Sequence, residues 1–264
     1  MHKFVSFNRQ ILPASETNLS AISSATLYGK GIFTTIAIYD NQPFLWEKHW
    51  LRLSDNASRI GLNFEFVEKD IFEALRELIA TNNIKNGRAR LTFLDESTKG
   101  IWGFENKKET SFLMTTADFR PLPEILKLTV SPYQVNSISP LVNIKSCNYL
   151  ENLLAFDEAK RRGFDEAIRL NERSEIVSAC LANIFWLKDD EIFTPSLKTG
   201  CLAGTMRGLI LEKYKAFEVE ENIESLEKAD AVFLTSAGLG IKQIFFAEKR
   251  GKVLKFIDLL PFAT

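Results

Sequence analysis

The sequence is poor in histidine. It has two histidines in 264 residues, and His2 lies at the N-terminus, where order is least expected. Only His49 is left for the interior of a fold. This scarcity argues against a zinc site built from histidines and against catalysis that needs several imidazoles, although a single histidine base stays open. We therefore expect no metal centre.

Cysteine, net charge and long apolar runs are also scarce. The three cysteines form no CxxC motif, so we expect the reduced thiols of a cytoplasmic protein. The formal net charge of -1 offers no positive surface of the kind that nucleic-acid binding uses. No apolar stretch reaches the about 20 residues that a bilayer span needs, and the N-terminus lacks the apolar core of a signal peptide. These absences predict a cytoplasmic protein without nucleic-acid or membrane partners.

Apolar residues are plentiful, because 45% of the chain is hydrophobic and 21 residues are phenylalanine. Their periodicity predicts strands and helices in both halves of the chain. The predicted strands are 3–7, 31–39, 88–93, 110–115, 126–130, 166–170, 183–188 and 231–235, and the predicted helices are 45–60, 67–84, 150–162 and 205–216. Residues 118–124 hold two prolines within three residues and are typical of a linker. The sequence thus predicts an α/β class with two domains, 1–117 and 125–264.

Lys145 lies between the apolar run LVNI and the start of a predicted helix. A lysine is ordinarily a solvated surface charge. In apolar surroundings the pKa of its ammonium falls, and the neutral amine becomes nucleophilic. This is the property that a Schiff-base lysine requires.

Two loops and one arginine are suited to an anion. In residues 200–208, GCLAGTMRG, Gly204 and Thr205 precede a predicted helix whose first backbone N–H groups attract phosphate. Residues 235–240, TSAGLG, form a second small-residue loop after a buried-looking strand, and Arg52 has the fork of donors that phosphate or carboxylate prefers. Taken singly, these loops are more typical of ordinary turns, and Arg52 is more typical of a surface arginine that pairs with Asp55 or Glu47.

Five short motifs, taken together and in order, resemble the class IV aminotransferases, the fold-type IV enzymes that depend on pyridoxal 5'-phosphate (PLP). The motifs are Tyr28-Gly-x-Gly-x-Phe, His49-x-x-Arg52-Leu, Lys145-x-x-Asn148, Ala182-Asn183-Ile-Phe and Gly204-x-x-Arg207. The resemblance covers roughly residues 25 to 245. It implies an α+β N-terminal domain, an α/β barrel-like C-terminal domain of the D-amino acid aminotransferase kind, and a homodimer whose active sites lie in the domain cleft.

The resemblance also implies roles for individual residues. Lys145 would hold PLP as a Schiff base and then move protons at the substrate α-carbon, and Arg52 would bind the phosphate. The other implied cofactor-binding residues are Tyr149, Ser178, Asn183, Gly204, Thr205, Met206, Thr235 and Ser236. Met206 occupies a position where the family usually has a hydroxyl, so the backbone amides there must contribute more.

Ser178 departs from the family pattern. It stands about 33 residues after the lysine, where the family places a glutamate facing the pyridine nitrogen. A carboxylate keeps that nitrogen protonated and deepens the electron sink, whereas a hydroxyl supplies no charge. Glu175 could serve only across a local bulge. A shallow sink disfavours transamination more than elimination, so Ser178 favours an eliminating enzyme, or it marks a divergent member of low activity.

Three further segments resemble 4-amino-4-deoxychorismate lyase within this family: Phe33-Thr-Thr, Ala182-Asn-Ile-Phe-Trp and Thr205-Met-Arg. We therefore expect a lyase that forms pyruvate and 4-aminobenzoate, a folate precursor. Its substrate is anionic, so cationic and polar residues should line its site. The candidate substrate-binding residues are Lys30, Thr34, Arg88, Arg90 and Lys242.

Two alternatives remain. The chain could be an aminotransferase for branched-chain or D-amino acids, or a non-catalytic protein on the same scaffold. In each case PLP chemistry needs little imidazole, because one lysine carries both the cofactor and the protons. His49 is then expected to pack or orient its helix rather than to react.

Overall fold

A computed structural model describes the chain except for residues 98–108, 120, 122, 124 and 246–264. The chain divides into two compact units. The first comprises Met1–Arg120 and Lys145–Asn148, and the second comprises Pro121–Ile144 and Tyr149–Thr264. No helix in the described part of the chain combines the length and the apolar character that a bilayer crossing needs.

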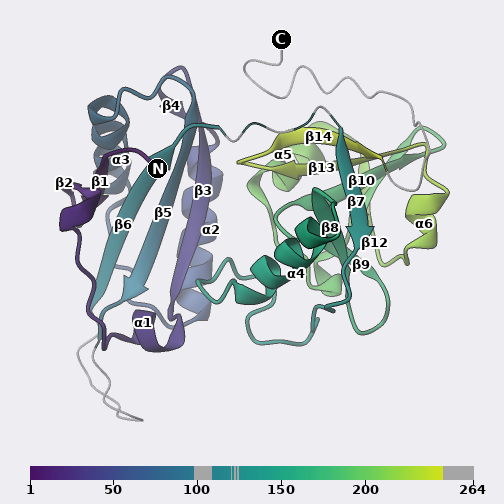
Figure 1. The fold of residues 1–264 in the computed structure, drawn as a ribbon, viewed down its shortest axis with the longest axis horizontal. Coiled ribbons are helices and arrows are strands. Elements are labelled where there is room, and N and C mark those ends of the chain that lie inside the picture. Colours follow the sequence, from purple (N-terminus) through teal and green to yellow (C-terminus); the bar gives the residue numbers. More distant parts are fainter. Residues whose placement is uncertain (98–108, 120, 122, 124, 246–264) are drawn as a thin grey trace. The chain divides into compact units, whose positions relative to one another are not determined.

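The first unit is an antiparallel sheet of six strands in the order β2-β1-β6-β5-β3-β4. Its elements are β1 (Phe4–Phe7), β2 (Gln10–Pro13), η1 (Ala14–Glu16), α1 (Ser24–Tyr28), β3 (Gly31–Tyr39), β4 (Gln42–Pro43), α2 (Trp46–Arg59), α3 (Glu68–Thr81), β5 (Gly87–Asp95) and β6 (Thr110–Ala117). Helices α2 and α3 lie on the same side of this sheet (Figure 1). Apolar residues at helical spacing, such as Leu53 and Ala57 on α2, are buried there.

A four-residue segment far along the chain completes this sheet. Phe33 N–H donates to Lys145 O at 2.9 Å, and Cys147 N–H donates to Gly31 O at 2.9 Å. A β-bridge joins Ile32 and Ser146 between them. Gly31 is required here, because a Cβ at this position would lie 2.6 Å from Phe93 O. The lysine segment therefore runs antiparallel to the start of β3.

This placement differs from the predicted domain division. The predicted linker, 118–124, includes the point where the chain passes from the first unit to the second, although residues 120, 122 and 124 lie outside the described residues. The prediction put all residues after 124 in one domain. Lys145–Asn148 instead belongs to the first unit, because it is hydrogen-bonded to β3.

The second unit is an eight-stranded mixed sheet in the order β12-β11-β10-β13-β14-β7-β8-β9. Its elements are β7 (Leu126–Val130), α4 (Leu150–Arg161), β8 (Glu166–Leu170), β9 (Ile176–Ala179), β10 (Asn183–Lys188), β11 (Glu191–Pro195), η2 (Leu197–Thr199), α5 (Thr205–Lys213), β12 (Ala216–Val219), α6 (Glu224–Glu227), β13 (Ala231–Ser236) and β14 (Gly240–Phe245). The sheet curls into a half-barrel. A tight turn, closed by Ala179 N–H donating to Ala182 O at 2.9 Å, joins end strand β9 to β10.

The two faces of this sheet are packed differently. One face forms the main apolar core of the unit, with Leu128, Ile168 and Ile184 among its buried residues. On the other face, Ala155 and Ala159 of α4 pack on the sheet. The mixed α/β class agrees with the sequence prediction. The predicted helix 205–216 ends earlier, at Lys213, because the chain turns at Tyr214 into β12.

Candidate active site

The backbone of Lys145 is held by a hydrogen bond, and its side chain lies on an aromatic ring. Its N–H donates to Asn56 Oδ1 of α2 at 2.9 Å. Its Nζ lies 4.5 Å from the centroid of the Phe33 ring. Burial, together with the positive charges of Arg52 and Arg90, lowers the pKa of Lys145 to about 7. A large fraction of this amine is therefore neutral and nucleophilic at neutral pH.

Arg90 shares the Phe33 ring with Lys145. Its guanidinium carbon lies 3.6 Å from the ring centroid, and its Nε donates to Thr92 Oγ1 at 3.2 Å. Stacking on an aromatic face suits the planar guanidinium, which keeps its in-plane donors available to other groups. The first unit thus places the Lys145 amine and the Arg90 guanidinium on one ring, and Arg52 adds a second positive charge that acts on Lys145.

One face of α2 supplies three of the residues around Lys145. His49, Arg52 and Asn56 are spaced by three and four residues, so they lie on the same side of the helix. Arg52 Nη2 donates to Thr34 Oγ1 of β3 at 2.7 Å. Thr34 was expected to contact the substrate, but its hydroxyl is fully buried and is engaged by Arg52 and, at 2.6 Å, by His49 Nδ1.

The other candidate substrate-binding residues differ in their charge partners and in the strands that carry them. Lys30 forms an ion pair with the buried Asp95 at 2.7 Å, so its charge is already matched. Arg88 lies two residues before Arg90 on β5, hence on the same face of the sheet. Lys242 belongs to β14 of the second unit, where its register partner is Leu234.

Two of the sequence motifs meet in the first unit. Gly29 ends α1 with a φ of 65°, and Asn148 Nδ2 donates to its carbonyl at 3.1 Å. A Cβ on Gly29 would lie 2.7 Å from Asn148 Oδ1. A glycine is therefore required both by the left-handed backbone and by the close approach of Asn148. This contact anchors the far end of the lysine segment.

In the second unit, the start of α5 has the features of an anion site. No side chain caps the helix at Gly204, as far as the described residues show, so its first N–H groups depend on other partners. Thr205 and Met206 form the buried first turn. A Cβ on Gly204 would overlap Asn183 Oδ1, and Asn183 Nδ2 donates to Leu202 O at 2.8 Å. Asn183 therefore fixes the loop that precedes the helix.

Thr235 lies beside this loop. It is the register partner of Asn183 between β13 and β10, so the two side chains share a face of the sheet. Thr235 Oγ1 is buried and has no hydrogen-bond partner among the residues that the structure describes. The next residue, Ser236, uses its Oγ to accept from Leu239 N–H at 3.1 Å and closes the turn into β14. A buried hydroxyl of this kind is satisfied when a ligand supplies the missing bond.

Ser178 lies on β9, directly opposite Arg169 of β8. Arg169 is buried, and its guanidinium donates to Gln134 O at 3.0 Å and lies 3.8 Å from Glu151. Sequence reasoning did not single out Arg169. The signal was an arginine in the otherwise apolar end of a predicted strand, since buried charges are rare in such positions.

Glu175 does not take the place of a carboxylate at position 178. A single-residue irregularity does occur in the pairing of β8 with β9. However, the Glu175 carboxylate accepts from Arg173 Nη2 at 2.7 Å and from Asn171 Nδ2 at 2.7 Å. The hydrogen bond from Arg173 lowers the pKa of Glu175. Its carboxylate is thus committed to a neighbouring ion pair.

Tyr149, the remaining predicted cofactor residue, directly precedes α4. It occupies the position just before Leu150, and its carbonyl accepts from Leu153 N–H at 3.2 Å. It follows directly on the lysine segment that the first unit holds. The helix therefore fixes the backbone of Tyr149.

The chemistry of these residues fits PLP. The cofactor needs a lysine amine of lowered pKa, a cation and helix N–H groups for its phosphate, and polar contacts for its ring. Within the first unit, Lys145 and Arg52 are such groups. Within the second unit, considered by itself, the start of α5 without a side-chain cap and the unsatisfied Thr235 hydroxyl are such groups. In the described part of the chain, no group of three or more His, Cys, Asp or Glu side chains is placed to hold a metal ion.

The chain is similar to known proteins over most of its length. The model of the amino-transferase class IV family matches residues 31–244. Aminodeoxychorismate lyase from Bacillus subtilis is 27% identical over 268 residues, covering 96% of this chain and 92% of that protein. A putative branched-chain-amino-acid aminotransferase from Methanocaldococcus jannaschii is 27% identical over 261 residues, covering 92% of this chain and 87% of that protein.

The fold is similar too. The crystal structure of a putative 4-amino-4-deoxychorismate lyase from Legionella pneumophila superposes with a TM-score of 0.83 at 25% identity, covering 93% of both chains. The expected fold-type IV architecture is confirmed. The family match spans far more than half of the chain and includes four of the five motifs in full and the first motif from Gly31 onward. The chain belongs to the amino-transferase class IV family of PLP-dependent enzymes.

Proposed function

We propose that this enzyme is a lyase that converts 4-amino-4-deoxychorismate into 4-aminobenzoate and pyruvate. The observation that carries the proposal is the lack of an available carboxylate at the Ser178 position, where Arg169 lies opposite and Glu175 is bound to Arg173. The similarity to the aminodeoxychorismate lyase from Bacillus subtilis supports the same function.

The proposed cofactor-binding residues differ in the part of PLP that they would hold. Lys145 Nζ forms the covalent attachment, and Arg52 binds phosphate. In the second unit, the N–H groups of Thr205 and Met206 and the hydroxyl of Thr235 serve the phosphate as well. Asn183 and Gly204 hold this loop in place, and Ser236 closes the turn beside it. Tyr149 and Ser178 contact the ring.

When bound, PLP supplies an electron sink for the substrate carbon that bears the amino group. Lys145 Nζ accepts the proton of that carbon. The C–O bond to the enolpyruvyl group then breaks and its electron pair leaves with the oxygen. The group departs as enolpyruvate, which takes up a proton to become pyruvate, and the remaining ring becomes aromatic. Arg90 and Arg88, on one face of β5, provide positive charge for the carboxylates of the substrate.

Ser178 favours elimination over transamination. Its hydroxyl offers the ring nitrogen a hydrogen bond without a negative charge, so a proton there is not stabilised. Transamination would need the electron sink to hold negative charge for longer than elimination needs. Elimination releases its electrons into the departing group at once, and aromatisation drives the step forward. A weak sink is therefore sufficient for the lyase reaction.

The test is to incubate the PLP-loaded enzyme with 4-amino-4-deoxychorismate and to measure both products. Equal amounts of 4-aminobenzoate and pyruvate are expected, and none from the Lys145→Ala variant. Failure of the loaded wild-type enzyme to form 4-aminobenzoate overturns the proposal.

The second candidate is an aminotransferase for branched-chain or D-amino acids. It is favoured by the aminotransferase relative, whose identity to this chain equals that of the lyase relative. It predicts that an amino donor alone converts the bound cofactor to its pyridoxamine form, with the corresponding loss of visible absorbance. This candidate keeps the roles of Lys145 and Arg52 unchanged.

We also propose a homodimer, as the family resemblance implies. Helix α4 presents three neighbouring leucines to solvent, with exposures of 65% for Leu150, 46% for Leu153 and 49% for Leu154. An apolar cluster of this kind on a helix is typical of a protein contact. A second copy of the chain is the partner that we expect to cover it.

A further inference from the structure

The buried hydroxyl of Thr34 connects two residues of α2. Thr34 Oγ1 is fully buried on β3. It accepts a hydrogen bond from Arg52 Nη2 at 2.7 Å and lies 2.6 Å from His49 Nδ1. His49 is 1% exposed. The three side chains therefore form one chain of short polar contacts inside the first unit.

The Thr34 hydroxyl can donate to His49 Nδ1 while it accepts from Arg52, which gives this chain one direction. A guanidinium only donates, so the contact from Arg52 uses a lone pair of the Thr34 oxygen. The hydroxyl has one proton of its own, and His49 Nδ1 is the acceptor in line for it. The imidazole then carries its proton on Nε2 and is neutral. Burial, followed by the charges of Arg52 and Lys145, holds the pKa of His49 well below its usual range, which agrees with a neutral ring.

We propose that His49 is a positioning residue for Arg52: by accepting the Thr34 proton, it turns a hydroxyl lone pair toward the guanidinium and fixes the direction in which Arg52 presents its remaining donors to the cofactor phosphate. The proposal rests on the phosphate-binding role of Arg52 given above. It assigns to the single interior histidine a task that needs neither proton transfer nor charge.

The geometry explains why a flexible arginine needs such support. Arginine has several rotatable bonds, and ordering it costs free energy when a ligand binds. A hydrogen bond made before binding removes part of that cost, because the guanidinium is already oriented. Thr34 lies within β3, opposite Leu91 of β5, and His49 stands one turn before Arg52 on the same helix face. Both supports are thus fixed by regular structure.

The first test observes the imidazole directly. The chain has only two histidines, so protein labelled with ¹⁵N-histidine gives two sets of ring signals, and a His2→Gln variant assigns those of His49. We expect an unprotonated Nδ1, a protonated Nε2 and no titration between about pH 5 and 8, the range in which an ordinary histidine changes charge. A protonated Nδ1 in this range overturns the proposal. This test needs no cofactor.

The second test compares PLP with pyridoxal, which lacks the phosphate. Thr34→Val removes the hydroxyl while keeping the branched shape. We expect it to weaken PLP binding to the apoprotein by about 10- to 100-fold, the range for losing a hydrogen bond to a charged group. Pyridoxal binding should not change. Thr34→Ser, which keeps the hydroxyl, should bind PLP like the wild type.

His49 has its own matched pair. His49→Leu removes the acceptor and should reproduce the selective loss of PLP binding, whereas His49→Asn, which places an amide oxygen near the position of Nδ1, should restore most of it. Equal losses for PLP and pyridoxal in Thr34→Val would show a general structural role and overturn the proposal. If Arg52→Ala itself fails to separate PLP from pyridoxal, the phosphate role of Arg52 is wrong, and the proposal falls with it.

Discussion

Lys145 owes its reactivity first to its burial and then to two neighbours of like charge. Its Nζ and the Arg90 guanidinium lie on the same Phe33 ring, and burial with Arg52 and Arg90 lowers its pKa to about 7. Only the neutral amine attacks PLP. The rate of covalent attachment of PLP to the apoprotein should therefore rise with pH up to about 7 and level off above it. Stopped-flow absorbance at a series of pH values measures this midpoint.

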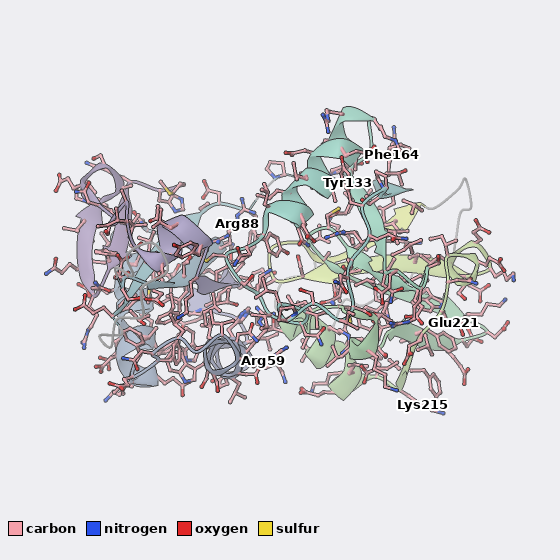
Figure 2. The ribbon with its side chains drawn as sticks, turned by 90° about the horizontal axis from the view of Figure 1, so that it is seen from below. Arg59, Arg88, Tyr133, Phe164, Lys215 and Glu221 are labelled. Atoms are coloured by element: carbon pink, nitrogen blue, oxygen red, sulfur yellow. The ribbon has the colours of Figure 1, made fainter. Side chains whose placement is uncertain are left out.

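Replacement of Arg90 tests the cause of that shift. A nearby positive charge disfavours the ammonium form, so removing it in Arg90→Gln should raise the pKa of Lys145 and move the midpoint to higher pH. Arg59→Gln serves as the control. Arg59 is an exposed residue at the end of helix α2 (Figure 2). It is not among the groups that lower the pKa of Lys145. Equal midpoints in wild type and Arg90→Gln would contradict this electrostatic account.

Ser178 is expected to set the type of reaction. Because we propose that position 178 faces the ring nitrogen, a Ser178→Glu variant should supply a carboxylate there and favour transamination. We expect the loaded variant to convert more of its cofactor to the pyridoxamine form when an amino donor is added, as measured by absorbance. Ser178→Ala provides the control for loss of the hydroxyl. An unchanged extent of conversion in Ser178→Glu would show that position 178 does not face the ring nitrogen.

At the scale of secondary-structure elements, Gly204, just before α5, and Gly208, inside α5, allow the effect of an added methyl group to be compared. A Cβ on Gly204 would overlap Asn183 Oδ1, whereas one on Gly208, in the same helix, meets no atom within 4 Å. Gly204→Ala should displace the start of α5 and lower PLP affinity at least tenfold. Gly208→Ala should keep the affinity and stabilise the fold by up to about 1 kcal/mol. Fluorescence titration with PLP and thermal unfolding measure both effects, and similar PLP affinities in the two variants would refute the assigned role of the α5 start.

Elements with strong local patterns were predicted from the sequence. The strand 31–39 coincides with β3, and the helices 45–60 and 150–162 lie within one residue of α2 and α4 at each end. The strand β9 was missed, because its four residues carry no clear alternation. The attachment of Lys145–Asn148 to β3 was missed as well, because pairing between segments more than 100 residues apart leaves no local periodicity.

The sequence indicated which residues belong to the candidate site, but it did not indicate which side chains they contact. The motifs singled out Lys145, Arg52 and the start of α5, and the roles given to them stay predictions. They did not reveal that Lys30 is paired with Asp95, or that Thr34 bridges His49 and Arg52. Such partners come from different elements, so only the folded arrangement of strands and helices identifies them.

At the scale of the whole molecule, the exposed leucines of α4 test the proposed homodimer. Leu154→Glu places a charge among Leu150, Leu153 and their expected partners, where burying it unpaired is costly. We expect this variant to elute as a monomer in size-exclusion chromatography with light scattering. Val67→Glu adds the same charge at an exposed position of 62% before α3, and it should leave the dimer intact. A monomeric wild type would disprove the homodimer.

The lyase assignment, on which the account depends most, is tested by a direct competition between reactions. One preparation of loaded enzyme is given 4-amino-4-deoxychorismate in one assay and an amino donor with a 2-oxo acid acceptor in another, and kcat/KM is determined for each. The account predicts that release of 4-aminobenzoate exceeds transamination of any branched-chain or D-amino acid by at least tenfold. A larger kcat/KM for transamination would contradict it.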